Sequence, residues 1–160
     1  MITPRIDLRK KLGFTPCNNF FLMFWTPILG PVAAMIYLQI LRLAGREKSQ
    51  VTISMKKLKD LVNVADNRTF KNYLTTLSAY GFIVYESNNE VRYKHRLIII
   101  IEDLPMYLDA KDVVKLPIAL QKKYHEFIAM SHLTLHEFLF HDDDIINNPP
   151  LPSVEIQEIT

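Results

Sequence analysis

A group of polar side chains in the middle of the chain recurs at helical spacing. Arg68, Lys71, Asn72 and Thr75 follow this spacing, with Asn67 and Thr76 at the margin of the group. The i, i+3, i+4, i+7 positions of this pattern share one face of a helix, opposite Phe70, Leu74 and Leu77. Arg and Lys neutralise phosphates or contact guanine, and Asn pairs with adenine. We interpret this face as a candidate DNA contact, although an ordinary solvated helix face has the same composition.

A second group of cations alternates with apolar residues along a β-prone segment. Arg92, Lys94 and Arg96 are separated by single residues, so on a strand all three share one face. The other face, with Val91 and Leu97, would pack against the rest of the domain. We expect these three cations to bind DNA together with the helical face.

The histidines of the C-terminal third raise the question of metal binding. His125, His132 and His136 would share a face of one unbroken helix. The segment 136–141 departs from the His-Glu-x-x-His zinc motif, because Phe140 occupies the position of the second ligand. Cys17 has no identifiable base beside it, and the chain contains no Gly-x-Ser-x-Gly motif. We expect no metal, no cofactor and no enzymatic activity.

The composition predicts one compact unit with short extensions. The 160 residues are 49% hydrophobic and 22% charged, which suffices for a core and argues against intrinsic disorder. The four glycines are too dispersed for a Walker-type or Gly-x-Gly-x-x-Gly phosphate loop. No segment reaches the roughly 20 apolar residues that span a bilayer, and the single Cys17 fits a reducing compartment. We expect a cytoplasmic protein without a membrane partner.

The formal net charge of +2 conceals an asymmetry along the chain. Residues 1–96 carry a formal charge of +9, whereas residues 97–160 carry −7. A basic portion joined to an acidic one suits a protein that binds a polyanion, with an acidic segment that rests on the basic face or recruits a cationic partner. Ordinary surface charge is the alternative interpretation.

The first predicted helix is apolar nearly all round. Pro31 suits its first position and Gly45 its end, so the helix covers residues 31–44. Only Gln39 and Arg42 are polar between residues 32 and 43. One side of this helix must therefore face the core, and the other must meet the N-terminal segment or a second subunit.

Two short helices follow a β-prone stretch at 51–53. Ser54 caps a predicted helix over 55–62, and Asp66 caps a predicted helix that runs to Tyr80 and is terminated by Gly81. Two helices joined by such a short turn, with a basic second helix, are typical of a helix-turn-helix that reads DNA.

Two β-rich runs, 82–86 and 91–101, flank the turn-like sequence Ser87-Asn88-Asn89-Glu90 and predict a hairpin. Helix, strand, helix, helix and hairpin is the order of a winged helix. The predicted fold is therefore mainly α with a small β-hairpin, a winged helix-turn-helix followed by a C-terminal helical extension.

The C-terminal third is predicted to be helical and then extended. Pro117 begins a helix from 118 to about 131, and Thr134-x-x-Glu137 predicts the capping box of a last short helix. The Asp- and Pro-containing end indicates an extended tail. The predicted segments are an N-terminal arm (1–30), a winged-helix domain (31–104), a helical extension (105–141) and an acidic tail (142–160).

The apolar residues in and before the first helix offer more apolar surface than a domain of this size leaves exposed. We expect them to mediate self-association into a homodimer or a higher oligomer. The predicted contact set is Phe21, Leu22, Trp25, Met35 and Leu38.

The sequence Trp-Thr-Pro-Ile-Leu-Gly-Pro-Val-Ala-Ala-Met-Ile-Tyr-Leu, residues 25–38, resembles the N-terminal pattern of bacterial DnaB/DnaD-type primosomal proteins. In that family an aromatic residue, a proline, two apolar residues and a glycine precede a helix that ends in an apolar-Tyr-apolar step. Later residues are similar to the family's helix-turn-helix and its ending, namely Leu58-Lys59-Asp60-Leu61, Phe70, Tyr73-Leu74, Leu77 and Tyr80-Gly81-Phe82-Ile83. The resemblance covers about residues 20–100, and the family's Tyr-x-x-x-Ile-x-x-Trp signature does not follow residue 105.

The resemblance implies a protein of DNA replication initiation or replisome assembly, a helicase loader or an origin-binding accessory. Such a protein binds double- or single-stranded DNA, self-associates and acts with other replication proteins. Two alternatives remain at this point: a winged-helix transcriptional regulator, and an interaction adaptor that oligomerises through the winged helix without binding DNA.

Overall fold

The computed structural model of the chain describes residues 15–45, 48–88 and 96–140. These residues are mainly helical with a small three-stranded antiparallel sheet. They divide into two compact units, which meet in the sequence between Gln121 and Lys122. The first unit contains the sheet and every described helix that precedes α7 (Ile118–Phe140), most of which belongs to the second unit.

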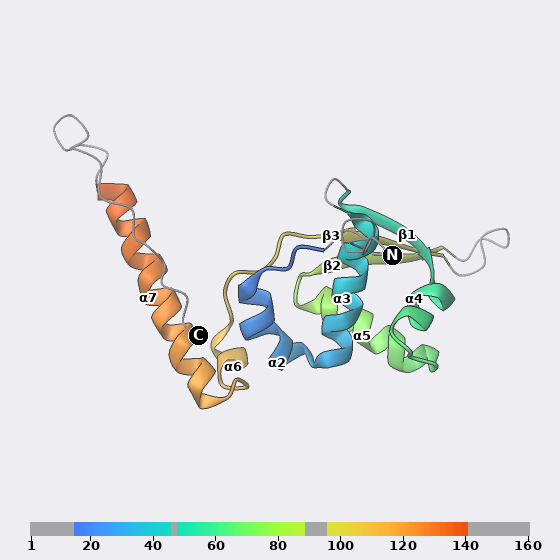
Figure 1. Cartoon of the computed structure of the whole chain (residues 1–160), viewed down its shortest axis with the longest axis horizontal. Helices are drawn as coiled ribbons and strands as arrows, with labels where there is room; N and C mark the ends of the chain where they lie inside the picture. Colours follow the sequence, from blue (N-terminus) through green and yellow to red (C-terminus); the bar gives the residue numbers. More distant parts are fainter. Residues whose placement is uncertain (1–14, 46–47, 89–95, 141–160) are drawn as a thin grey trace, which may run out of the picture. The chain divides into compact units, whose positions relative to one another are not determined.

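The first unit alternates helices with the strands of its sheet. Its elements are η1 (Phe21–Trp25), α2 (Thr26–Leu29), α3 (Pro31–Ala44), β1 (Gln50–Ser54), α4 (Met55–Leu61), α5 (Asn67–Ala79), β2 (Ile83–Asn88), β3 (Arg96–Ile101) and α6 (Ala110–Val113). The strands lie in the order β1-β3-β2, so β3 is central and β1 and β2 are edges. Helices α3, α4 and α5 lie on one side of the sheet (Figure 1).

Local signals account for the two helices between β1 and β2. The Ser54 side chain accepts a hydrogen bond from the Lys57 amide at 3.1 Å, and the Asp66 carboxylate accepts one from the Thr69 amide at 2.6 Å. Each bond satisfies an amide that the first helical turn leaves unpaired. Gly81, with φ +83°, ends the second helix in a conformation that costs other residues strain. Both capped helices are confirmed to within one residue of their predicted ends.

The N-terminal segment before α3 belongs to the core. Phe21 packs its ring against Tyr37 of α3 at 4.9 Å and against Phe82 at 5.7 Å between centroids. Trp25 lies edge-on to Phe82 at 5.0 Å. Of the two candidates for covering the apolar α3, the N-terminal segment is thus the one that the structure shows. Phe21, Trp25 and Leu29, which the sequence prediction placed in an N-terminal arm, are buried in one core with α3.

The sheet is longer than the sequence indicated. Ser87 pairs with Leu97 and Asn88 with Arg96, so the prediction of a turn that starts at Ser87 is wrong. Ser87 is tolerated there because the ladder satisfies its backbone groups and its side chain, near the end of an edge strand, is exposed. The remaining turn residues, and the predicted contacts Arg92 and Lys94, lie outside the described residues.

Helix α7 runs without a break from Ile118 to Phe140, so the predicted interruption near Ser131 and the separate last helix capped at Thr134 are wrong. The Ser131 hydroxyl donates to the Phe127 carbonyl at 2.9 Å. This bond satisfies the serine within the helix, so the residue does not end it. None of the described helices is long and apolar enough to cross a membrane.

Candidate nucleic-acid interface

Helix α5 presents a sharply divided surface. Phe70, Leu74 and Leu77 are completely buried on the side that faces the sheet and α3. The predicted contact residues on the opposite side are all exposed, namely Asn67, Arg68, Lys71, Asn72 and Thr75. The structure therefore gathers these five side chains on one solvent face, hereafter the α5 face.

Two of the five side chains on the α5 face already have partners within the chain. Asn67 accepts a hydrogen bond at its Oδ1 from Lys59 Nζ of α4 at 2.6 Å. The Thr75 hydroxyl donates to the Lys71 carbonyl at 2.9 Å and lies 3.2 Å from the Tyr85 hydroxyl of β2. These bonds fix the position of α5 relative to α4 and to the hairpin.

The other three side chains are available to a ligand. Among the residues that the structure describes, none forms a hydrogen bond or an ion pair with the side chains of Arg68, Lys71 or Asn72. Arg68 and Lys71 are cations in solvent, and the amide of Asn72 offers both a hydrogen-bond donor and an acceptor. This combination can neutralise phosphates and read a base edge.

Lys59 is a functional candidate that sequence reasoning did not single out. Its Nζ donates to the neutral amide oxygen of Asn67, which places the Lys59 charge beside the α5 face. The hydrogen bond from the Thr69 backbone lowers the pKa of the nearby Asp66, and Lys59 adds to this effect. The sequence signal for Lys59 was the run of lysines on α4. Which of these lysines faces α5 depends on the conformation of the turn between the two helices.

Arg96 is not part of the α5 face. It is exposed and precedes the buried Leu97 on β3, so their side chains lie on opposite faces of the sheet. Tyr85 shares the face of Leu97 and reaches Thr75, which places α5 on that side. The structure therefore separates Arg96 from the helical cations with which the sequence grouped it.

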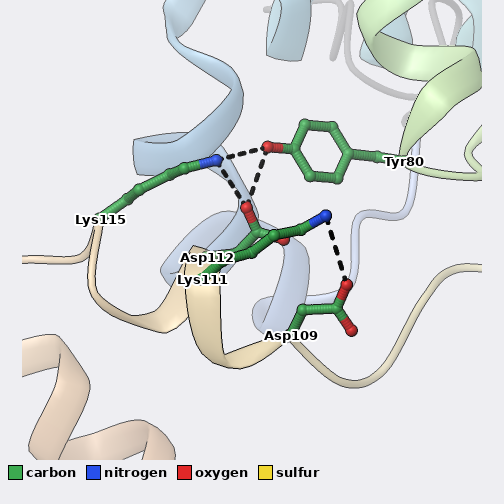
Figure 2. A network of polar contacts seen from close by, with 5 residues as sticks. All are labelled: Tyr80, Asp109, Lys111, Asp112 and Lys115. Atoms are coloured by element: carbon green, nitrogen blue, oxygen red, sulfur yellow. Dashed lines mark hydrogen bonds and ion pairs between the residues drawn. The ribbon is translucent and has the colours of Figure 1, made fainter.

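A pocket of about 640 Å³ lies at the C-terminal end of α5. Aromatic residues in its lining include Trp25, Tyr80 and Tyr107, and its cations are Lys111 and Lys115. Each cation has a carboxylate partner (Figure 2): Lys111 lies 3.8 Å from Asp109, and Lys115 lies 2.6 Å from Asp112. The pocket is therefore charge-balanced and offers less attraction to a polyanion than the α5 face.

Asp112 is the centre of this polar network. It is 2% exposed, and its Oδ1 accepts hydrogen bonds from Lys115 Nζ at 2.6 Å and from the Tyr80 hydroxyl at 3.1 Å (Figure 2). Burial alone would raise the pKa of the Asp112 carboxyl, but these two bonds outweigh it and hold the pKa below its usual range. The bond to Asp112, and a second bond that Lys115 Nζ donates to the Tyr80 hydroxyl at 3.0 Å, raise the pKa of Lys115. The network joins α6 to the end of α5, which is a structural role.

The five predicted oligomerisation residues differ in exposure. Leu22 and Met35 are 48% and 46% exposed, and Leu38 is half-buried. Phe21 and Trp25 are 1% and 3% exposed, and the Trp25 indole donates to the Pro105 carbonyl at 2.7 Å. Those two belong to the core of this chain, because the Phe82 and Tyr37 rings cover them, so a second copy could meet only the other three.

The predicted histidine face of α7 lies only partly within the described side chains. His125 is exposed. No three His, Cys, Asp or Glu side chains gather closely enough to hold a metal ion in the part of the chain whose side chains are described.

No family model matches the chain, and neither a curated protein nor a solved structure matches it. The α5 face and the sequence patterns are therefore the grounds on which a function can be assigned.

Proposed function

We propose that this chain is a winged-helix protein that binds DNA through the α5 face and acts in DNA replication initiation or replisome assembly. It works by binding, without catalysis or a cofactor, and in the cytoplasm. Its partners are DNA, further copies of itself and other replication proteins.

The order of elements supports the winged-helix assignment. Helix α3, strand β1, helices α4 and α5 and the β2–β3 hairpin follow one another, with β1 paired to the far strand of the hairpin. In helix-turn-helix proteins the second helix of the pair enters the major groove with its exposed side chains. Helix α5 occupies that position, and its buried side anchors it to the core.

The observation that carries the proposal is the free state of Arg68 and Lys71. Lys111 and Lys115, at the far end of α5, each lie beside a carboxylate. Arg68 and Lys71 stand beside Asn72 without such a partner in the described part of the chain. Lys59 adds a third positive charge at the same end of the helix.

The replication role is supported by the resemblance of residues 25–38 to primosomal proteins. In the structure these residues run from the end of η1 through α2 into α3, and they bury Trp25, Leu29 and Tyr37 in the core. The pattern thus belongs to the domain that carries the α5 face.

The salt dependence of DNA binding tests the proposal. Fluorescence anisotropy would be recorded with labelled single-stranded and duplex DNA of several unrelated sequences, between about 50 and 200 mM KCl. For duplex DNA the logarithm of affinity falls with the logarithm of salt by about 0.9 per phosphate neutralised. The double variant Arg68→Gln/Lys71→Gln should therefore lose about two units of slope and bind more weakly on every sequence.

The matched control is Lys122→Gln/Lys123→Gln, which removes the same charge from exposed positions of α7. Its salt slope should equal that of the unchanged chain. Equal slopes for all three proteins would contradict the assignment of the α5 face. No binding at about 50 mM KCl would favour the interaction adaptor, and strong preference for one palindromic duplex would favour the transcriptional regulator.

A further inference from the structure

The outer edge of β1 has backbone groups directed away from the sheet. The Ile101 amide donates to the Ser49 carbonyl at 2.7 Å, and the register places Val51 opposite Ile99. In an antiparallel ladder, residues that bond to the partner strand alternate with residues that do not. Val51 therefore turns its amide and carbonyl toward β3, whereas Gln50 and Thr52 turn theirs toward the open edge.

A groove of about 210 Å³ follows this edge. It is lined by β1, by Leu43 at the end of α3, and by two lysines, Lys48 before the strand and Lys57 after it. Both lysines are exposed, and neither makes an ion pair within the described residues. The described lining of the groove includes these two lysines and no carboxylate, so this part of the lining carries positive charge.

We propose that the β1 edge binds an extended acidic peptide segment of a partner protein, which adds to the sheet as a fourth strand. Main-chain hydrogen bonds to Gln50 and Thr52 supply the affinity, as in other cases of strand addition. Lys48 and Lys57 select carboxylates toward the two ends of a segment about as long as β1. A β-branched residue between them would face Leu43.

The backbone pattern favours a peptide over a nucleic acid at this edge. A peptide strand offers alternating donors and acceptors that match the outward amides and carbonyls of Gln50 and Thr52. Phosphates offer acceptors alone, and they would face two carbonyl oxygens here. Lysines beside an edge strand also discourage pairing with another edge that carries lysines. A strand with carboxylates removes that repulsion, so the same two residues select the partner.

A charge-swap experiment tests the role of the lysines. The ¹⁵N-labelled full chain would be titrated with a capped peptide of sequence Glu-Val-Thr-Val-Glu and with its counterpart Lys-Val-Thr-Val-Lys. We expect the acidic peptide to shift the amide signals of Gln50 and Thr52, and the basic peptide to leave them unchanged. The variant Lys48→Glu/Lys57→Glu should bind the acidic peptide at least tenfold more weakly and should bind the basic one. The control Lys56→Glu/Lys122→Glu, which reverses two lysines outside the groove, should behave as the unchanged chain.

A second variant tests the main-chain contacts. Thr52→Pro removes an outward amide without touching the bonds that Val51 makes to β3, a position at which an edge strand tolerates proline. Thr52→Pro should no longer bind the acidic peptide, whereas Thr52→Val should still bind it. The β3 amides should be equally protected from hydrogen exchange in the two variants. If Thr52→Pro fails to fold, an acidic peptide N-methylated at its central residues provides the same test on the unchanged chain and should not bind.

Three results would overturn the proposal. The first is an acidic peptide that shifts no signal between residues 48 and 57 at millimolar concentration. The second is equal binding of the acidic peptide by Thr52→Pro and Thr52→Val. The third is an oligonucleotide that displaces the peptide from the Arg68→Gln/Lys71→Gln variant and binds that variant undiminished when Thr52→Pro is added, which would make the edge a nucleic-acid site. None of these results depends on Arg68 or Lys71, so the proposed function stands or fails separately.

Discussion

The Asp112 carboxylate holds α6 against the end of α5, and replacing it with an amide should loosen this attachment. Asp112→Asn keeps the size of the side chain and one acceptor oxygen but removes the negative charge. A hydrogen bond to a charged group contributes about 1.5–3 kcal/mol, and Asp112 accepts two such bonds while it is 2% exposed. Lys115 is half exposed and regains water when the charge is lost, which reduces the cost. We expect the free energy of unfolding to fall by about 2 kcal/mol.

Urea unfolding at neutral pH measures this change. For a slope of about 2 kcal/mol per molar urea, the transition midpoint should fall by about 1 M. Asp109→Asn is the matched control, because Asp109 pairs with Lys111 at 3.8 Å with both side chains more than half exposed. An exposed pair of this kind contributes about 0–1 kcal/mol. Tyr80→Phe removes one of the two donors to Asp112 while it keeps the ring beside Trp25, and it should cost about 1 kcal/mol.

The pH dependence provides a second readout of the same carboxylate. The folded pKa of Asp112 lies below the ordinary value, so its contribution to stability is fully present above the unfolded pKa of about 3.9. It is lost as the pH falls through the folded pKa. The stability gap between the unchanged chain and Asp112→Asn should therefore close below about pH 4. A gap that is absent at neutral pH, or that persists undiminished in acid, would refute the role of the charge.

Two further predictions concern self-association and the acidic tail. Met35→Glu places a charge on an exposed part of α3 and should split the oligomer without unfolding the chain. Phe21→Glu should instead unfold the chain, because the carboxylate would be buried among aromatic rings. If the unchanged chain sediments as a monomer at tens of micromolar in sedimentation velocity, self-association is contradicted. Truncation after Phe140 removes a tethered acidic segment and should tighten DNA binding a few-fold in anisotropy titrations. The oligomeric state should stay unchanged. Weaker DNA binding by the truncated chain would contradict autoinhibition by the tail.

Local signals predicted the helices that carry their own boundaries. Ser54, Asp66 and Gly81 each act within three residues of the helix end they define, so their effect is readable without knowledge of the fold. The order of helices and strands followed from these boundaries and from the β-prone stretches. The divided surface of α5 was predictable for the same reason, because helical periodicity alone places Phe70 and Lys71 on different faces.

Non-local contacts decided the elements that sequence reasoning missed or misplaced. The segment 20–29 contains Pro27 and no polar stripe, and only its packing against Tyr37 and Phe82 makes it part of the core. Ser87 and Asn88 have the composition of a turn, yet their partners on β3 extend the ladder. The sequence around Asp112 is typical of a surface carboxylate. Its burial was not predictable from that sequence, because the hydroxyl that helps to bury it comes from Tyr80, 32 residues earlier.

The candidate site shows the same division between local and non-local information. A sequence shows where the cations lie along the chain, but it does not show which of them have carboxylate partners. The structure ranks them by their partners: Lys115 is neutralised by Asp112, Arg96 lies on the opposite face of the sheet, and Arg68 and Lys71 keep their charge on the α5 face. Lys59 is identified as a candidate contact only by its hydrogen bond to Asn67. The positive charge available to a polyanion is therefore set by which carboxylates the fold brings to which cations.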